Sequence, residues 1–311
     1  MIFHFDSSVV DKAYAHDLAS YLKLIHEKKH KIDYDSPSVW DFIEQEVLCT
    51  AYLGKVDIDL IKENKELREV NKIDRDYFRT VNIGTKPGMT DLATLGIILK
   101  TNSCVVLENS HHDWWPIKIW VDFVKNDRDY KEINKKVSEA IALKWIYPEH
   151  AGGGDGTITN KIKDIEQSTY SSAIKLKVTT IFDSDKVSAT IPSHKNKGLK
   201  KFLMDNGFDY HEWERREIEN YIPLRIYKIC NLCQRNQAEP DITPEVWNYT
   251  DIVKHPYFNG KYTKDKLPML AKKIDKPSVK ESFASKTILN KVDNHLVSEL
   301  QYVIFLLAKY I

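Results

Sequence analysis

Four short segments with the composition of buried strands recur at intervals of about 35 residues through the middle of the chain. They span 103–108, 142–147, 174–182 and 209–213, and helical patterns lie between them at 115–124, 160–170 and 197–206. Parallel strands need a long crossover between them, and this spacing leaves room for a helix each time. The sequence therefore predicts an α/β fold, a parallel sheet flanked by helices on both faces.

The regions before and after this central segment have mainly helical sequence patterns. Apolar residues at helical spacing fill 11–31 and 39–53, a further short helix is expected from Thr90 to Lys100, and 57–80 has the charge density of a solvated helix pair. The last apolar stretch, 285–310, predicts a final helix. We expect three regions: a helical N-terminal region at 1–100, an α/β catalytic domain at 101–223 and a helical C-terminal region at 224–311.

Composition narrows the class of protein. The chain is 42% apolar and 29% charged, which favours folded domains over disorder, and its net charge of +1 is far too small for a protein that coats duplex DNA. Four cysteines are too few for a disulfide scaffold. The first residues lack the pattern of a signal peptide, and the late apolar run at 303–308 is short for a membrane span. We expect a cytoplasmic protein without membrane contact.

Acidic residues follow two of the predicted strands directly. Glu108 ends the first strand, and Asp183 and Asp185 end the third. Ligands collect outside the carboxyl ends of strands in parallel sheets, and three carboxylates gathered there repel one another unless a cation neutralises them. Oxygen-only ligands favour Mg²⁺ or Mn²⁺, ions that activate water and stabilise charge on phosphoryl groups. The alternative is that these acids serve as helix caps or turn residues.

These positions give a resemblance to the TOPRIM domain, which covers about 103–223. The family pattern is an acid after the first strand, a glycine turn after the second and Asp-x-Asp after the third, here Val106-Leu-Glu108, Gly152–Gly154 and Phe182-Asp-Ser-Asp185. TOPRIM domains occur in topoisomerases, primases and the overcoming-lysogenization-defect (OLD) nucleases. The resemblance implies a nuclease with a metal-binding acidic centre.

A second match extends the resemblance toward the OLD-like and related phage-defence nucleases. Arg215–Tyr221 resembles the segment that follows their fourth strand, where the second acid helps to hold metal. This implies Glu219 as a fourth metal ligand, ahead of Glu217. The family often has glycine after the first acid, where this chain has Asn109, and a second acid four residues after the first, where it has His112.

Several weaker features have two interpretations. Asp113 follows one position after the expected second acid, so a second metal site there is not predicted, and His111, His112 and Asp113 line the pocket or belong to a surface loop. The remaining features could contact phosphate or be ordinary surface and turn residues: Gly152–Gly156, Arg215, Arg216, Lys195, Lys197, Lys200 and Lys201. Cys230 and Cys233 have the spacing of half a zinc site, but no second cysteine pair completes it.

Together these observations favour a Mg²⁺- or Mn²⁺-dependent endonuclease in anti-phage defence. Glu108, Asp183 and Asp185 are the expected catalytic and metal-binding residues, and Glu219 is expected to bind metal. The substrate is DNA, RNA or transfer RNA. The chain has no phosphate-binding Gly-x-x-x-x-Gly-Lys-Ser/Thr motif, so an ATPase would be a separate subunit, and a homo-oligomer stays open.

Two other functions compete with this hypothesis. The first is a non-catalytic regulatory or assembly subunit that uses a TOPRIM-like core as a scaffold. The second is a phosphotransferase or phosphatase in which the first Asp of the pair is the nucleophile. In those enzymes the Asp pair usually follows the first strand of the fold, and here it follows the third.

Overall fold

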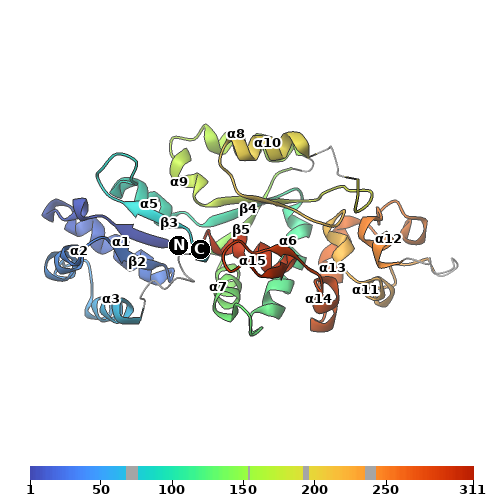
Figure 1. Ribbon diagram of the computed structural model, residues 1–311, viewed down its shortest axis with the longest axis horizontal. Coiled ribbons are helices and arrows are strands. Elements are labelled where there is room, and N and C mark those ends of the chain that lie inside the picture. The colour runs from blue at the N-terminus through green and yellow to red at the C-terminus, as the bar shows by residue number, and fades with distance from the viewer. Residues whose placement is uncertain (68–75, 153–154, 192–195, 235–242) are drawn as a thin grey trace.

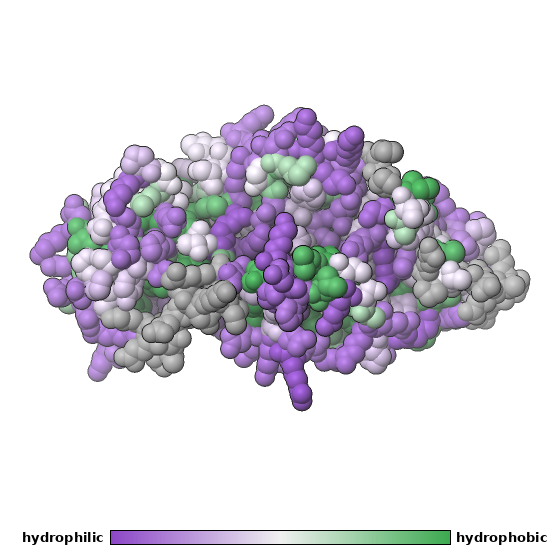
Figure 2. Space-filling view, viewed as in Figure 1, coloured by the Kyte–Doolittle hydropathy of each residue, from purple (hydrophilic) through white to green (hydrophobic). Residues whose placement is uncertain are grey.

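The computed structural model describes residues 1–67, 76–152, 155–191, 196–234 and 243–311. Its elements form three blocks along one long axis, with the N-terminal sheet at one end, a four-stranded sheet in the middle and short helices at the other end, while both chain ends lie near the centre (Figure 1). No helix within those ranges combines the length and apolar character needed to cross a membrane. Hydrophilic residues dominate the face seen in Figure 2, where apolar residues form separate small areas.

The N-terminal block is a three-stranded parallel sheet with the order β2-β1-β3, wrapped by helices. Its strands are β1 (Ile2–Phe5), β2 (Lys31–Tyr34) and β3 (Thr80–Ile83). Its helical elements are η1 (Ser7–Val9), η2 (Lys12–Tyr14), α1 (Ala15–Glu27), α2 (Pro37–Phe42), η3 (Ile43–Val47), α3 (Lys55–Leu67) and α5 (Leu92–Lys100). Helices outnumber strands here as expected, but the sheet at their centre was not predicted.

The middle block is a four-stranded parallel sheet with the order β5-β4-β6-β7. Its strands are β4 (Ser103–Leu107), β5 (Ile146–His150), β6 (Val178–Phe182) and β7 (Tyr210–Glu212). The intervening helices are α6 (Ser110–Val124), α7 (Lys131–Ala142), α8 (Asp155–Glu166), α9 (Ser171–Lys175) and α10 (Lys197–Asp205). The predicted parallel sheet flanked by helices is therefore confirmed at the level of an α/β fold.

Alternating side chains of the middle sheet enter two separate cores. Val105 and Leu107 pack into the core beneath α6, whereas Cys104 and Val106 pack beneath α8 and α10. Figure 1 shows the same division, with α8 and α10 on one side of the sheet and α6, α7 and α15 on the other. Successive residues of a strand point to opposite faces, so a strand covered on both faces is a continuous apolar run.

The C-terminal block contains short helices and one hairpin. Its helical elements are η4 (Ile218–Tyr221), α11 (Leu224–Ile229), α12 (Pro244–Tyr249), η5 (Pro256–Phe258), η6 (Lys264–Lys266), α13 (Leu267–Ala271), α14 (Lys276–Ser282) and α15 (Glu299–Ala308). The prediction of one helix over 285–310 is wrong in its first half, because β8 (Lys286–Leu289) and β9 (Leu296–Ser298) form an antiparallel hairpin there.

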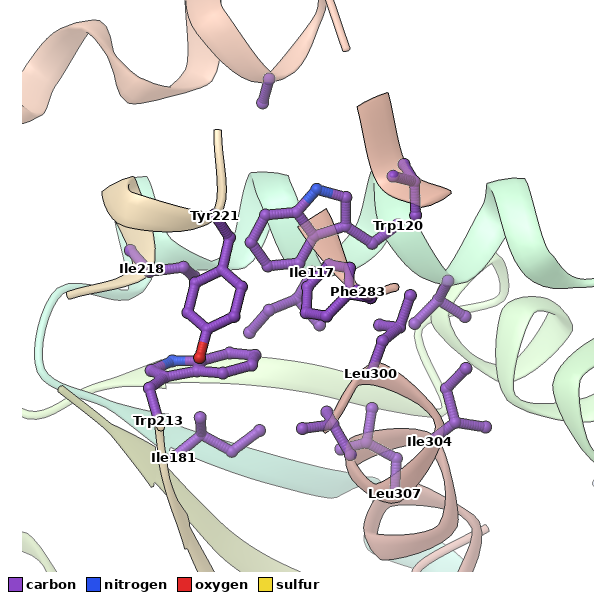
Figure 3. Packing of buried hydrophobic residues seen from close by; sticks show 14 of the residues in the cluster. Ile117, Trp120, Ile181, Trp213, Ile218, Tyr221, Phe283, Leu300, Ile304 and Leu307 are labelled. Carbon is purple, nitrogen blue, oxygen red and sulfur yellow. The ribbon is translucent and has the colours of Figure 1, made fainter. Parts of the chain in front are cut away.

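An aromatic core joins this block to the middle sheet. Trp120 of α6 lies edge-on to Trp213, with ring centroids 6.0 Å apart, and edge-on to Phe283 at 5.0 Å. Tyr221 stacks on Phe283 at 5.0 Å, and its hydroxyl donates to the buried carboxylate of Glu299 at the start of α15. Figure 3 shows these rings converging between the sheet and α15. The core fixes the turn that carries two acids of the candidate site.

Candidate active site

The carboxyl ends of β4 and β6 lie side by side. The two strands pair directly, with Leu107 opposite Ile181, so Glu108 and Asp183 leave the same edge of the sheet from neighbouring strands. Adjacent strands are separated by about 4.8 Å. The first and third strands of this sheet are therefore neighbours.

Asp183 is the buried anchor of this edge, with 6% of its surface exposed. Its Oδ1 accepts a hydrogen bond from the backbone N–H of Ile218 at 2.9 Å, and its Oδ2 lies 3.5 Å from Nζ of Lys264. These contacts connect the end of β6 to η4 and η6, two elements from the C-terminal block.

The turn after β7 contributes two more carboxylates. Glu217 caps η4, and the capping exchange is completed by Asn220, whose side-chain oxygen accepts from the Glu217 N–H at 2.9 Å. Glu219, inside the turn, has no exposed surface, and its Oε1 lies 3.4 Å from the hydroxyl of Tyr262. Ile218 and Tyr221, which flank this acid, insert into the aromatic core (Figure 3). Packing of its neighbours therefore holds Glu219 in an interior position.

Asp113 comes from the first turn of α6. Its Oδ2 accepts from the backbone N–H of Asn109 at 3.1 Å, and only 7% of the residue is exposed. Asp183 and Glu219 both raise its pKa through space, so Asp113 faces the same interior as those acids. The spacing comparison gave no basis for a metal-binding role here, although Asp113 was among the residues considered as lining the pocket.

Lys264 of η6 lies between three of these carboxylates. Its Nζ is 3.5 Å from Asp183, 3.7 Å from Glu217 and 3.5 Å from Glu219. We refer to Asp113, Asp183, Glu217 and Glu219, together with the ammonium of Lys264, as the acidic cluster. Three acids pair with one lysine and Asp113 interacts with it through space, so negative charge is in excess whenever the acids are ionised.

This excess shifts the titration of the cluster. Burial, opposed by Lys264 and reinforced by Glu219, raises the pKa of Asp183 to about 6. Burial and the charge of Glu219 raise the pKa of Glu217 to about 8, and burial raises the pKa of Asp113 well above its ordinary value. Burial alone would lower the pKa of Lys264, but the surrounding carboxylates outweigh it and raise that pKa. The lysine therefore stays charged, while the acids compete to hold protons.

The sequence-predicted acids have different outcomes. Asp183 and Glu219 meet in the acidic cluster, and Asp185 lies close enough to raise the pKa of Asp183. Asp185 adopts a left-handed backbone with φ of 53°, and its N–H donates to the carbonyl of Arg216 at 2.9 Å. Glu108 stands at the same sheet edge, half-buried, and its place is set by the pairing of β4 with β6.

The two arginines considered as phosphate ligands have structural partners. Arg215 donates to the carbonyls of Asn220 and Ser282 and lies over the ring of Tyr221, 4.4 Å from its centroid. Arg216 pairs with Asp251 at 3.4 Å. Both therefore brace the turn that holds Glu217 and Glu219.

The other weak candidates add little to the site. Lys200 pairs with Glu212 at 2.9 Å, while Lys197 and Lys201 are exposed. Lys195, Gly153 and Gly154 lie outside the described residues, and Gly152 has the positive φ of a turn, 104°. Cys230 and Cys233, near the end of α11, are not joined in a disulfide.

The donor chemistry of the acidic cluster suits a hard cation. Across the described residues, three of its oxygens are buried and accept no hydrogen bond: Oδ1 of Asp113, Oε2 of Glu217 and Oε2 of Glu219. Buried carboxylate oxygens in this state are costly unless a cation compensates them. Throughout the same part of the chain, no three His, Cys, Asp or Glu side chains are already arranged as a metal-binding set. A metal ion would bind here by rearranging carboxylates that now face Lys264.

Two clefts lie apart from the acidic cluster. One of about 770 Å³ is bounded by the α6–α7 loop, α14 and the β8–β9 hairpin. The other, about 480 Å³, follows β7 along its outer side. Neither of these two clefts is lined by the four acids or Lys264.

Comparisons with known proteins identify no relative. No protein-family model, no curated protein and no solved structure matches the chain. The assignment to a TOPRIM-like family therefore rests on the residue pattern, and function must be argued from the site itself.

Proposed function

We propose that this protein is a divalent-metal-dependent nuclease of TOPRIM type that hydrolyses phosphodiester bonds at the acidic cluster. One observation carries the proposal: three buried carboxylates converge on a single lysine at the carboxyl edge of a parallel sheet, the buried Asp113 interacts with them through space, and Glu108 and Asp185 stand at adjoining strand ends. This edge is where parallel sheets bind ligands, and the surplus of buried acids favours a guest with more than one positive charge.

The cation that these residues would hold is Mg²⁺ or Mn²⁺, since every available donor is oxygen. When bound, such an ion lowers the pKa of water and offsets charge on a phosphoryl group. Asp183 and Glu219 would be its main protein ligands, because each is buried and fixed by backbone or aromatic neighbours. Glu108 and Asp185, both partly exposed, would complete the set from the solvent side.

Lys264 has a different task in this proposal. Its raised pKa rules out a role as general base, because it does not release its proton near neutral pH. It provides a fixed positive charge that holds the carboxylates together before a metal arrives and faces an incoming phosphate afterwards. Its side chain is 37% exposed, so the ammonium is accessible from the open side.

A cleavage assay tests the proposal. The purified protein is incubated with supercoiled plasmid and with total RNA, in Mg²⁺, Mn²⁺ or EDTA. We expect metal-dependent cleavage that falls at least about 100-fold in Asp183→Asn and in Glu219→Gln, because each change removes charge that the metal and the transition state require.

Asp122→Asn is the matched control. Asp122 is an exposed acid on α6 that pairs at the surface with Lys125 at 2.7 Å and accepts from the Ser138 hydroxyl at 3.2 Å, so this variant should cleave like the wild type. Undiminished cleavage by both cluster variants would assign the activity to a contaminant or another site. Absence of cleavage in every condition, with an added ATPase partner included, would favour a non-catalytic assembly subunit. The proposed setting in anti-phage defence would be tested separately, by phage challenge of cells that carry the Asp183→Asn gene.

A further inference from the structure

An exposed tryptophan lies on α6, the helix that carries Asp113 of the acidic cluster. Trp115 of α6 is 40% exposed, although tryptophan is the largest apolar side chain and is usually covered. It is two residues from Asp113 and about 8 Å along the helix axis from the start of α6, at a rise of 1.5 Å per residue. An exposed ring on the helix that carries an acid of the proposed phosphodiester site is a candidate for binding the substrate.

Two lysines flank this ring. Nζ of Lys118, on α6, and Nζ of Lys272, just after α13, each lie 5.7 Å from the centroid of Trp115. Both side chains are exposed, and within the described ranges neither forms an ion pair with an acid. Their charges are therefore available to a ligand that covers the tryptophan.

Two imidazoles continue this surface toward the sheet. His111 occupies the same helix face as Trp115, four residues earlier, and its ring centre is 5.4 Å from that of His150 at the end of β5. Both histidines are exposed. We refer to His111, His150, Trp115, Lys118 and Lys272 as the aromatic–basic ridge.

The aromatic–basic ridge and the acidic cluster are carried by the same helical segments. α6 carries Asp113 as well as Trp115, and the segment of η6 and α13 carries Lys264 and then Lys272. The two helices pack against each other, since Leu267 and Leu270 of α13 enter the same core as Ile117 of α6. The spacing between ridge and cluster is therefore fixed by a shared core.

We infer that the ridge binds a single-stranded segment of nucleic acid, with one base stacked on Trp115 and adjacent phosphates on Lys118 and Lys272. Aromatic rings interleaved with basic groups are the usual platform for unpaired strands, because a base inside a duplex has no free face to offer. The net charge of +1 agrees with this limited contact, since broad duplex binding needs many more cations. The inference rests on the proposed nuclease function and names its substrate class.

Binding is measured in EDTA, where cleavage cannot occur. Fluorescence anisotropy compares labelled oligo(dT) and oligo(U) of about 12 nucleotides with a duplex of equal length, within the usual site size of such platforms. We expect both single strands to bind more tightly than the duplex. Trp115→Ala should weaken single-strand binding by about 5- to 100-fold, whereas Trp115→Phe, which retains a stacking face, should lose much less.

Further variants separate stacking from charge. Lys118→Gln and Lys272→Gln should each reduce the slope of log K against log salt by about 0.7, the value for one phosphate contact on a single strand. Tyr52→Ala is the matched aromatic control, because Tyr52 is 66% exposed but belongs to the N-terminal block. It should bind as the wild type does.

Two results would overturn the inference that the ridge binds single strands. The first is that Trp115→Ala binds single strands as tightly as the wild type does. The second is that the wild type binds the duplex more tightly than the single strands. Because the assay needs no metal and no turnover, its result stands apart from cleavage. If the protein binds single strands selectively but never cleaves, the binding inference is supported and the proposed nuclease function is refuted. If the protein cleaves but Trp115→Ala binds single strands as the wild type does, the nuclease function is supported and the binding inference is refuted.

Discussion

The protein contains two parallel sheets whose carboxyl edges have opposite electrostatics. At the edge of the N-terminal sheet, Asp6 follows β1 and is satisfied by Lys86, 2.8 Å away, and by the Ser8 N–H at 2.8 Å. The Lys86 contact holds the pKa of Asp6 well below its usual range. In the acidic cluster four carboxylates share one lysine, and the pKa values of Asp113, Asp183 and Glu217 are raised. Equivalent positions in similar sheets thus differ in charge balance, and the proposed cation site lies at the unbalanced edge.

The largest expected difference between the two sheet edges is the loss of stability when the lysine at each edge, Lys264 or Lys86, is replaced by methionine. Lys264→Met should lower the free energy of unfolding in EDTA by about 2–4 kcal/mol, less than the full cost of breaking a buried pair because 37% of the side chain is exposed. Lys86→Met should cost much less, since Lys86 is 56% exposed and solvent screens its pairing with Asp6. Urea denaturation at pH 7 measures both. Equal losses of stability in the two variants would mean that the two edges do not differ in their excess of negative charge.

Metal should act on one edge alone. Mg²⁺ at 100 times its dissociation constant should stabilise the wild type by about 2.7 kcal/mol, seen as a higher Tm. Asp183→Asn should abolish this rise because it removes a central ligand, whereas Asp6→Asn should keep it. A rise that survives in Asp183→Asn would place the ion elsewhere.

The stability of the metal-free protein should fall between pH 5 and pH 8. Glu217 and Asp183 have folded pKa values of about 8 and about 6, above their ordinary values of 4.5 and 3.8, so the folded state binds more protons than the unfolded state. Their contribution is full below the unfolded pKa and is lost as pH rises through the folded one. Thermal denaturation in EDTA should therefore give a lower Tm at pH 8 than at pH 6, and Glu217→Gln should flatten the difference. An unchanged slope in that variant would contradict the assignment.

The smallest effect belongs to Asp6. Its depressed pKa means that its contribution to stability is present above the unfolded value and is lost as pH falls through the folded one. Asp6→Asn should therefore lower Tm by a few degrees at pH 7, and the gap to the wild type should narrow as pH drops below about 4. Circular dichroism across this range gives the comparison, and a gap that widens in acid would show that the sign is wrong.

Local patterns were sufficient where one physical rule dominates. The strand expected at 103–108 and the helices expected from Thr90 to Lys100 and over 197–206 correspond closely to β4, α5 and α10. The strand at 142–147 was placed too early, because β5 begins at Ile146 after the unpredicted helix α7. Strand and helix periods overlap in short apolar runs, which explains this error.

The N-terminal sheet escaped prediction for a related reason. β2, Lys31–Tyr34, is half-buried throughout and carries two charged residues, and β3 has only two buried positions, Val81 and Ile83. Segments this short and polar become strands because β1 lies between them and supplies hydrogen bonds to both. That stabilisation comes from partners distant in sequence, so no local pattern records it.

The sequence by itself determined the alternation of strands and helices in the middle of the chain and the acids that end β4 and β6, because burial on both faces and the direction of parallel strands leave few alternatives. Only the tertiary structure decided that Asp113 and Glu217 join Asp183 and Glu219, and that Lys264 lies among them. Lys264 is 81 positions from Asp183 along the chain. Coulomb energy depends on distance in space, and the packing of α13 on α6 sets that distance.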